Sequence, residues 1–425
     1  MVMKMNTRTF IDRWLYIEIG RVIGVNMSMC VGIRRLSLVR CRRFSSKPIS
    51  QSVKSLDDEC ESLNTMYSDM FTVPGTSKDG ISESGSVDEL DELNSELNSL
   101  YHVGFQVLDS KDLEEMVKSK GRFIIRSLSN DPYYNLALED YVFRNTPIAV
   151  DHESFHSQRL MFYVNDKCAV IGKNQNIWKE LYVKELNNNG YDIIRRFSGG
   201  GAVIHDLGNV NYSYLTSRDE FKREFFNEKI VHWLLGIDPN LSISLNERGD
   251  ITYNGYKVSG SAFKIAKGKS YHHGTMLINS ELEKFTGLLK PKSTPGIQWK
   301  CNSVDSVRSK VANIPLSGTN AFIDICADGF RSHFTKNETS IFYCNESSSI
   351  NQEIIETMEK LKSHHWKFNN TPSFAIDILN GRYSLEVDKG TITKSNPSHL
   401  IGLSFNEFVD HVSKEIDPSI LRSLQ

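Results

Sequence analysis

Three consecutive glycines constrain this chain more than any other feature of its sequence. They are Gly199, Gly200 and Gly201, and they follow a strand-like run at 191–194 and the pair Arg195–Arg196. Because glycine has no Cβ, a ligand can approach such a backbone closely, and several N–H groups can converge on an anion. A tight turn or a bulge explains a glycine triplet about as well. The arginines before the triplet add positive charge, which favours an anion-binding loop.

A second string, at 250–262, contains the dipeptide Asn254–Gly255 between alternating residues. This dipeptide predicts a two-residue hairpin turn. The alternation of side chains along a strand then places Lys257 and Ser259 on one face. A lysine beside a turn is most often a solvated surface charge, so Lys257 becomes a candidate anion ligand only together with the other strings.

A third string, at 271–278, begins with polar residues and includes His272 and His273. Paired histidines suggest zinc, but adjacent strand residues point to opposite faces and no further ligand stands at metal spacing. The seven cysteines are scattered and contain no Cys-x-x-Cys pair. They indicate reduced thiols rather than a disulfide framework or a zinc site.

Local signals predict several further elements. Asp131–Pro132, followed by apolar residues at i, i+4 spacing, predicts the start of an amphipathic helix. The apolar runs at 161–164 and 168–171 flank a polar tripeptide and predict a hairpin. Nearer the C-terminus, Asn380–Gly381 predicts another hairpin, and Ser404-x-x-Glu407 predicts a capped helix.

Charge is unevenly distributed along the chain, whose formal net charge is -2. Residues 1–44 carry Lys4 and eight arginines against two acids, which is typical of a mitochondrial transit peptide; a disordered basic tail is the alternative. Residues 56–100 hold twelve acids and one lysine, too polar a composition to form a core. We predict a transit peptide at 1–44, an acidic disordered linker at 45–120, and location in the mitochondrial matrix.

The 425-residue chain is long enough for two or three domains. Beyond the basic leader it is acidic, which disfavours nucleic-acid binding, because phosphate neutralisation needs surplus Lys and Arg. No stretch reaches the run of about 18 apolar residues that a membrane span requires. We therefore expect neither a nucleic-acid partner nor a membrane span.

Taken together, the strings resemble lipoate-protein ligase A and the mitochondrial lipoyltransferases. They read Arg-Arg-x-Ser-Gly-Gly-Gly-Ala-Val-x-His-Asp at 195–206, Lys-Val-Ser-Gly-x-Ala at 257–262 and His-His-Gly-Thr at 272–275, with Asn-Leu-Ala-Leu-Glu at 135–139. The resemblance implies an α+β fold of the biotin/lipoate-protein-ligase kind, a mixed and largely antiparallel sheet flanked by helices. It also implies a catalytic domain at 121–335 and a small α+β accessory domain at 340–425.

The same resemblance implies a lipoate-protein ligase, which uses ATP to make lipoyl-AMP and then lipoylates a carrier lysine. Lys257 would be the catalytic residue, and Asp250 would help to hold Mg²⁺. The residues implied to bind lipoate or nucleotide, with His205 included from the same string, are Arg196, Ser198, Gly199, Gly200, Gly201, His205, Asp250, Ser259, Gly260, Ala262, His273, Gly274 and Thr275. The partners would be the lipoyl domains of 2-oxoacid dehydrogenase acyltransferase subunits and the glycine-cleavage H protein.

This chemistry is physically coherent. Attack of a carboxylate on the α-phosphate joins two anions, so a desolvated lysine and converging N–H donors would stabilise the developing charge. The carrier lysine then attacks a mixed anhydride, so no enzyme nucleophile is required. The lipoate tail needs an apolar trench, for which the candidates are Tyr163, Val170, Ile204 and Met276.

Two alternatives stay open. Gly249–Asp250 stands where the family commonly has Asn-Asp, and this difference is compatible with an ATP-independent lipoyl or octanoyl transferase that takes the acyl group from a pre-activated donor or from H protein. The second alternative is a non-catalytic carrier-binding protein. It is less favoured because the lysine, the arginines and the glycine loop all persist.

Overall fold

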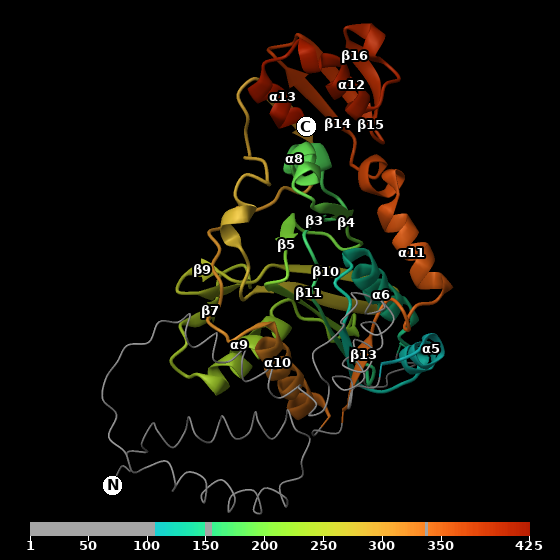
Figure 1. Cartoon of the computed structure of the whole chain (residues 1–425), viewed down its shortest axis with the longest axis vertical. Helices are drawn as coiled ribbons and strands as arrows, with labels where there is room; N and C mark the ends of the chain where they lie inside the picture. The colour runs from blue at the N-terminus through green and yellow to red at the C-terminus, as the bar shows by residue number, and fades with distance from the viewer. Residues whose placement is uncertain (1–106, 149–154, 336–338) are drawn as a thin grey trace, which may run out of the picture. The chain divides into compact units, whose positions relative to one another are not determined.

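The computed structural model describes residues 107–148, 155–335 and 339–425 (Figure 1). The predicted transit peptide and the predicted linker up to residue 106 lie outside the described residues. Within the described ranges the chain is of the α+β class, as predicted, and its strands form four sheets. No helix in these ranges has the length and apolarity of a membrane span.

The largest sheet has six strands in the order β10-β11-β6-β2-β1-β13. These strands are β1 (Phe123–Ser127), β2 (Arg159–Tyr163), β6 (Asn209–Ser217), β10 (Ser261–Ala266), β11 (Lys269–Leu277) and β13 (Ile341–Cys344). β1 runs parallel to both of its neighbours, whereas the other three pairings are antiparallel. The sheet is therefore mixed and largely antiparallel, as predicted.

Both faces of this sheet are covered, because successive residues of its central strands supply two different cores. In β2, Met161 and Tyr163 belong to one core, and Leu160 and Phe162 to the other. The first core is covered by α5 (Ser110–Lys118), α6 (Pro132–Asn145) and α11 (Gln352–Lys362), and the second by α9 (Phe225–Ile237) and α10 (Thr319–Phe334) (Figure 1).

Helix α6 begins where the sequence predicts, with Asp131 accepting hydrogen bonds from two first-turn N–H groups and Pro132 at the first position. It is not the amphipathic helix that was predicted, since residues 132–143 are all buried. The reason is that α5 and α11 pack against it. Helix α5 also corrects the predicted linker, because Leu113 and Val117 enter the core before residue 120.

Two small sheets flank the large one. One contains β3 (Cys168–Ile171), β4 (Asp192–Arg195) and β5 (Val203–His205), and the other β7 (Ile243–Leu245), β8 (Ile251–Tyr253) and β9 (Tyr256–Lys257). The predicted hairpin of 161–164 with 168–171 is wrong, because β2 and β3 belong to different sheets. Asn165 between them is fully buried and bonded to other side chains instead of forming a surface turn.

The fourth sheet lies toward the C-terminus and has the order β12-β14-β15-β16. Its elements are β12 (Ile297–Cys301), β14 (Phe374–Ile378), β15 (Tyr383–Asp388) and β16 (Thr391–Asn396), with α12 (Phe405–His411) and α13 (Pro418–Leu424). The predicted hairpin at Asn380–Gly381 and the predicted Ser404–Glu407 capping box are confirmed. The remaining short helices are α7 (Ile177–Glu180), α8 (Val183–Asn188), η1 (Leu282–Phe285), η2 (His365–Asn369), η3 (Ser398–Leu400) and η4 (Val412–Lys414).

The predicted division at residues 335–340 does not coincide with the sheets. β12, from the predicted catalytic domain, pairs with β14 of the C-terminal sheet. Conversely, β13, from the predicted accessory domain, pairs with β1 of the six-stranded sheet. Each predicted domain thus supplies an edge strand to the sheet of the other, so the two predicted segments exchange strands across the division.

Candidate active site

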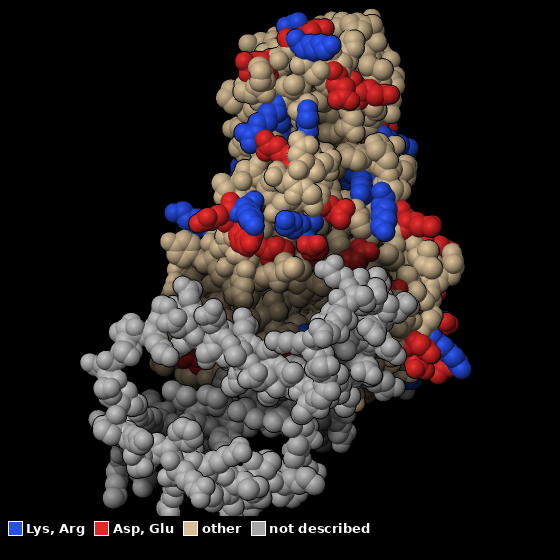
Figure 2. Space-filling model, in the orientation of Figure 1, with Lys and Arg blue, Asp and Glu red and all other residues tan. Residues whose placement is uncertain are grey.

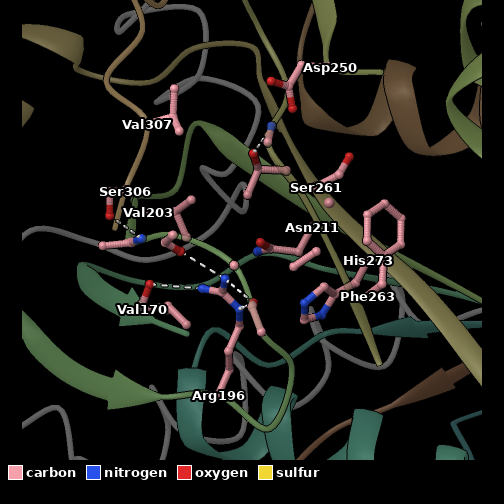
Figure 3. A pocket seen from close by; sticks show the side chains of 18 of the residues that line it. Val170, Arg196, Val203, Asn211, Asp250, Ser261, Phe263, His273, Ser306 and Val307 are labelled. Atoms are coloured by element: carbon pink, nitrogen blue, oxygen red, sulfur yellow. Dashed lines mark hydrogen bonds between the residues drawn. The ribbon is translucent and has the colours of Figure 1, made fainter. Parts of the chain in front are cut away.

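A cavity of about 370 Å³ opens where the glycine string, the β8–β9 hairpin and the strands β10 and β11 converge. Gly199, Gly200, Gly201 and Lys257 line this same cavity, so the lysine and the glycine loop predicted from separate strings face one cavity. The other predicted residues that line it are Arg196, His205, Asp250, Gly260, Ala262, His273, Gly274 and Thr275. Figure 3 shows Asp250 toward one end of the cavity and Arg196 with Val170 toward the other.

Arg196 holds the glycine loop in shape. Its Nη2 donates to the carbonyls of Gly199 and Gly201 at 2.6 and 2.8 Å, its Nε to Gly199 and to the Ser198 hydroxyl, and its Nη1 to the carbonyl of Val170. Burial lowers the pKa of this guanidinium to about 10, so it remains charged at neutral pH. Arg196 thus lines the cavity, as predicted, and also shapes the glycine loop.

The orientation of the loop carbonyls leaves the loop amides available. Among the described residues, none accepts a hydrogen bond from the N–H groups of Gly199, Gly200 or Gly201. One position in this loop and one on the loop that faces it require glycine. Gly200 has a φ of +91°, and a Cβ on the facing Gly172 would lie 2.1 Å from the carbonyl oxygen of Gly200. Unpartnered N–H groups on a loop without side chains form a site suited to an anion.

Arg195 lies elsewhere, contrary to the prediction that both arginines add charge to the loop. It is fully buried and outside the cavity lining. Its guanidinium donates to the carbonyls of Gly172, Lys173 and Gln175 on one side, and on the other to Lys367, Trp366 and the Thr371 hydroxyl. Arg195 thus joins the 172–175 loop to the segment that enters the C-terminal sheet.

Lys257 sits on the predicted hairpin. Asn254 and Gly255 form the turn with φ values of 49° and 79°, as a two-residue turn of this kind requires. The Lys257 Nζ lies 2.9 Å from Oδ2 of Asp250, which immediately precedes the paired strand β8, and the two side chains are 22% and 11% exposed. The ammonium is thus held at the cavity wall by a single carboxylate and remains accessible to a second anion.

Two predicted serines contact the site indirectly, since neither lines the cavity. Ser198 lies between Arg196 and His273, with its Oγ 2.7 Å from His273 Nε2. Ser259 bonds to the buried hydroxyl of Tyr212. The Ser198 hydroxyl thus contacts two residues that line the cavity, whereas Tyr212, the partner of Ser259, does not line it.

The apolar end of the cavity is only partly as predicted. Tyr163 and Val170 line it, together with Leu136 of α6. Ile204 and Met276 do not, because each is buried in a hydrophobic core behind its strand. His205, which follows Ile204, does line the cavity. Burial, reinforced by Arg196 and His273, lowers the pKa of His205 to about 3, which keeps the ring neutral.

Several lining residues were not predicted. They are Leu136, Ala202, Val203, Asn211, Arg223, Arg248, Gly249, Ser261, Phe263 and the stretch 304–307. The stretch 304–307 is fastened to the glycine loop by Ser306, whose Oγ accepts hydrogen bonds from Ala202 N–H and from Gln175. Arg223 and Arg248 lie in irregular polar segments, so no local pattern distinguishes them from surface charges.

No cysteine of the described chain is suited to act as a nucleophile at this cavity. Cys168 is fully buried, and burial raises the pKa of its thiol well above the usual value. None of the free cysteines lines the cavity. The arrangement provides an ammonium, loop amides and an apolar end, which suits the activation of an acyl carboxylate more than covalent catalysis.

Known proteins match this sequence and fold. A sequence model of the lipoyl protein ligase A/B catalytic domain matches residues 131–334. A curated Saccharomyces cerevisiae protein, named "Putative lipoate-protein ligase A", is 43% identical over 378 residues, which cover 86% of this chain and 92% of that protein. The chain belongs to the lipoate-protein ligase A family. Family membership makes the protein an enzyme, and the matched range includes every residue that lines the cavity.

Two further known proteins are similar at lower identity. The Bacillus subtilis lipoate-protein ligase LplJ is 34% identical over 296 residues, covering 64% of this chain and 82% of its own. The crystal structure of P. falciparum LipL1 in complex with lipoate matches at a TM-score of 0.50 with 23% identity, over 70% of this chain and 95% of that chain. The predicted ligase fold is confirmed by this structural match.

Proposed function

We propose that this lipoate-protein ligase activates lipoate with ATP and transfers the lipoyl group to a lysine of a carrier domain. The observation that carries the proposal is the meeting of the Lys257 ammonium and the glycine-loop amides at one cavity with an apolar end. The cavity volume of about 370 Å³ is in the range of small-molecule sites.

In the first half-reaction, a lipoate carboxylate oxygen attacks the α-phosphorus of ATP, and pyrophosphate leaves. Lys257 and the amides of the glycine loop offset the negative charge that accumulates there. In the second, the carrier amine attacks the carbonyl carbon, AMP leaves with the bonding electrons, and the new amide nitrogen loses a proton. Both steps need only positioned charge, in agreement with the absence of a reactive cysteine from the cavity lining.

We assign Mg²⁺ to the side of Asp250. No group of three or more His, Cys, Asp or Glu in the described ranges could hold a metal alone. Mg²⁺ typically binds through one or two carboxylates together with substrate phosphates and water. Asp250 lines the cavity beside Lys257 and fits that role once a nucleotide is bound.

The proposal is tested by mixing purified protein with lipoate, ATP and Mg²⁺ and measuring pyrophosphate release. We predict that K257A lowers the rate by about 100-fold or more, because one preorganised cation is lost where charge develops. K310A is the matched control, since Lys310 is an exposed neighbour outside the cavity lining. Wild-type protein that releases no pyrophosphate, yet transfers a lipoyl group from acylated H protein, would establish the ATP-independent alternative.

We further propose that the carriers are lipoyl domains of 2-oxoacid dehydrogenase acyltransferase subunits and the glycine-cleavage H protein, and that the enzyme works in the mitochondrial matrix. The support for the location is the arginine-rich, acid-poor composition of residues 1–44. Replacing Arg34, Arg35, Arg40, Arg42 and Arg43 with serine should abolish mitochondrial import of the tagged full chain. Unchanged import would remove the support for a transit peptide.

A further inference from the structure

A continuous line of hydrogen bonds runs beneath the cavity from a buried carboxylate to the glycine loop. The carboxylate of Glu139, in the middle of α6, lies 3.0 Å from Nδ1 of His273 through either oxygen. Nε2 of the same ring lies 2.7 Å from the Ser198 hydroxyl, which in turn accepts from Nε of Arg196 at 2.9 Å. Arg196 then donates to the loop carbonyls of Gly199 and Gly201.

The two ends of the line constrain the directions of its hydrogen bonds, because a carboxylate only accepts and a guanidinium only donates. A carboxylate only accepts hydrogen bonds, so Nδ1 of His273 must carry a proton. In the tautomer that carries its single proton on Nδ1, Nε2 accepts a hydrogen bond from the Ser198 hydroxyl. Its oxygen is left to accept from Arg196. Glu139, which does not line the cavity, is thus connected to the arginine fork through the His273 ring and the Ser198 hydroxyl.

We propose that Glu139 is a positioning residue for acyl activation: through His273 and Ser198 it orients Arg196, and thereby holds the Gly199 and Gly201 carbonyls inward and the loop amides toward the substrate. Only the expected effect on the rate of acyl activation rests on the proposed function. The geometry of the loop itself is independent of the reaction.

A nucleophilic role for Ser198 fits the structure less well, although the Ser198–His273–Glu139 order is that of a hydrolase triad. Ser198 is 1% exposed and does not line the cavity. Its oxygen already accepts a hydrogen bond from a cationic guanidinium, which reduces its nucleophilicity. The carboxylate therefore acts on loop geometry and not by activating a serine.

The hydrogen bonds to His273 also explain how the carboxylate of Glu139 can be buried. The residue is 5% exposed on α6, and a buried carboxylate is costly unless it is hydrogen-bonded. Its next polar contact is the Tyr163 hydroxyl, at 3.5 Å. The His273 bonds are thus its principal compensation, and the opposite charge at the other end of the line is Arg196.

The test compares E139M, E139Q and a matched control, D140N. Asp140 is an equally buried carboxylate at the next position of α6, but it pairs with Arg144 and Lys264 instead. Amide hydrogen exchange by mass spectrometry, on peptides that cover 196–203, reports loop order without requiring activity. We expect faster exchange there in E139M, recovery in E139Q, which retains an acceptor oxygen, and no local change in D140N.

In the pyrophosphate assay, E139M should lower kcat by about 100-fold, as loss of positioning by about 1 Å does, while KM for lipoate changes little. If E139M is insoluble, E139D replaces it, because it keeps the charge but withdraws the carboxylate from His273. Loop exchange in E139M or E139D equal to that in D140N would overturn the inference. A wild-type protein without pyrophosphate release would overturn the proposed function and leave the exchange comparison valid.

Discussion

Arg196 makes bonds that a lysine could not make. Its planar fork reaches the Ser198 hydroxyl and the carbonyls of Gly199 and Gly201, whereas a lysine offers a single compact ammonium. We predict that R196K keeps the charge but lowers the free energy of unfolding by about 1–3 kcal/mol for each acceptor left unpaired. Lipoate activation should fall with it. Urea unfolding and pyrophosphate release measure the two effects, and wild-type activity in R196K would show that charge alone matters.

His205 makes folding sensitive to acid. Burial, aided by Arg196 and His273, lowers its pKa from 6.5 to about 3. Above pH 6.5 the ring is neutral in the folded and the unfolded chain. Between pH 6.5 and 3 only the unfolded chain takes up this proton, so the free energy of unfolding falls as the pH falls. H205Q should lose stability less steeply than the wild type between pH 6.5 and 4 in urea titrations. Equal slopes of unfolding free energy against pH in H205Q and the wild type would contradict the lowered pKa of His205.

At the scale of elements, the glycine loop depends on a second loop packed against it. A Cβ at Gly172 would lie 2.1 Å from the Gly200 carbonyl oxygen, so G172A must displace backbone and should cost about 1–3 kcal/mol. G236A is the matched control, because Gly236 of α9 has nothing within 4 Å of an added Cβ. It should be neutral or slightly stabilising. The midpoints of thermal unfolding of both variants test this prediction. Equal midpoints would mean that the two loops move apart at little cost in free energy.

Elements with a local cause were predictable from the sequence, and those with a tertiary cause were not. The Asn254–Gly255 turn and the Ser404–Glu407 capping box follow from bonds within a few residues. The false hairpin between β2 and β3 had equally good local signals, but Asn165 is drawn into the interior by Asn135 and His205. Likewise, nothing local to the pair Arg195–Arg196 distinguishes the arginine that shapes the loop from the one that turns away.

At the scale of the whole described chain, the surface and the core give different views of its organisation. Figure 2 shows acidic and basic residues interspersed on the visible face, as on an ordinary globular protein. Inside, one hydrophobic core joins β3, β4 and β5 to the C-terminal sheet and α12. Trp178 stands between them, with rings of Phe374 and Phe405 within 5.8 Å and its indole N–H donating to Asn406. The C-terminal sheet therefore packs against β3, β4 and β5, the strands around the 195–206 string.

Because the C-terminal sheet region shares a hydrophobic core with β3, we expect a destabilising substitution in that region to destabilise β3 as well. F405A removes a fully buried ring and should cost about 3–5 kcal/mol. Because Phe405 shares its core with Ala169 and Ile171 of β3, amide exchange in β3 should accelerate together with that in β15. F330A is the control: Phe330 is equally buried but belongs to the core beneath α9 and α10, so it should affect β6 and leave β15 protected. If F405A accelerates exchange in β15 alone, the C-terminal sheet unfolds independently of β3, and the prediction that it stabilises β3 is wrong.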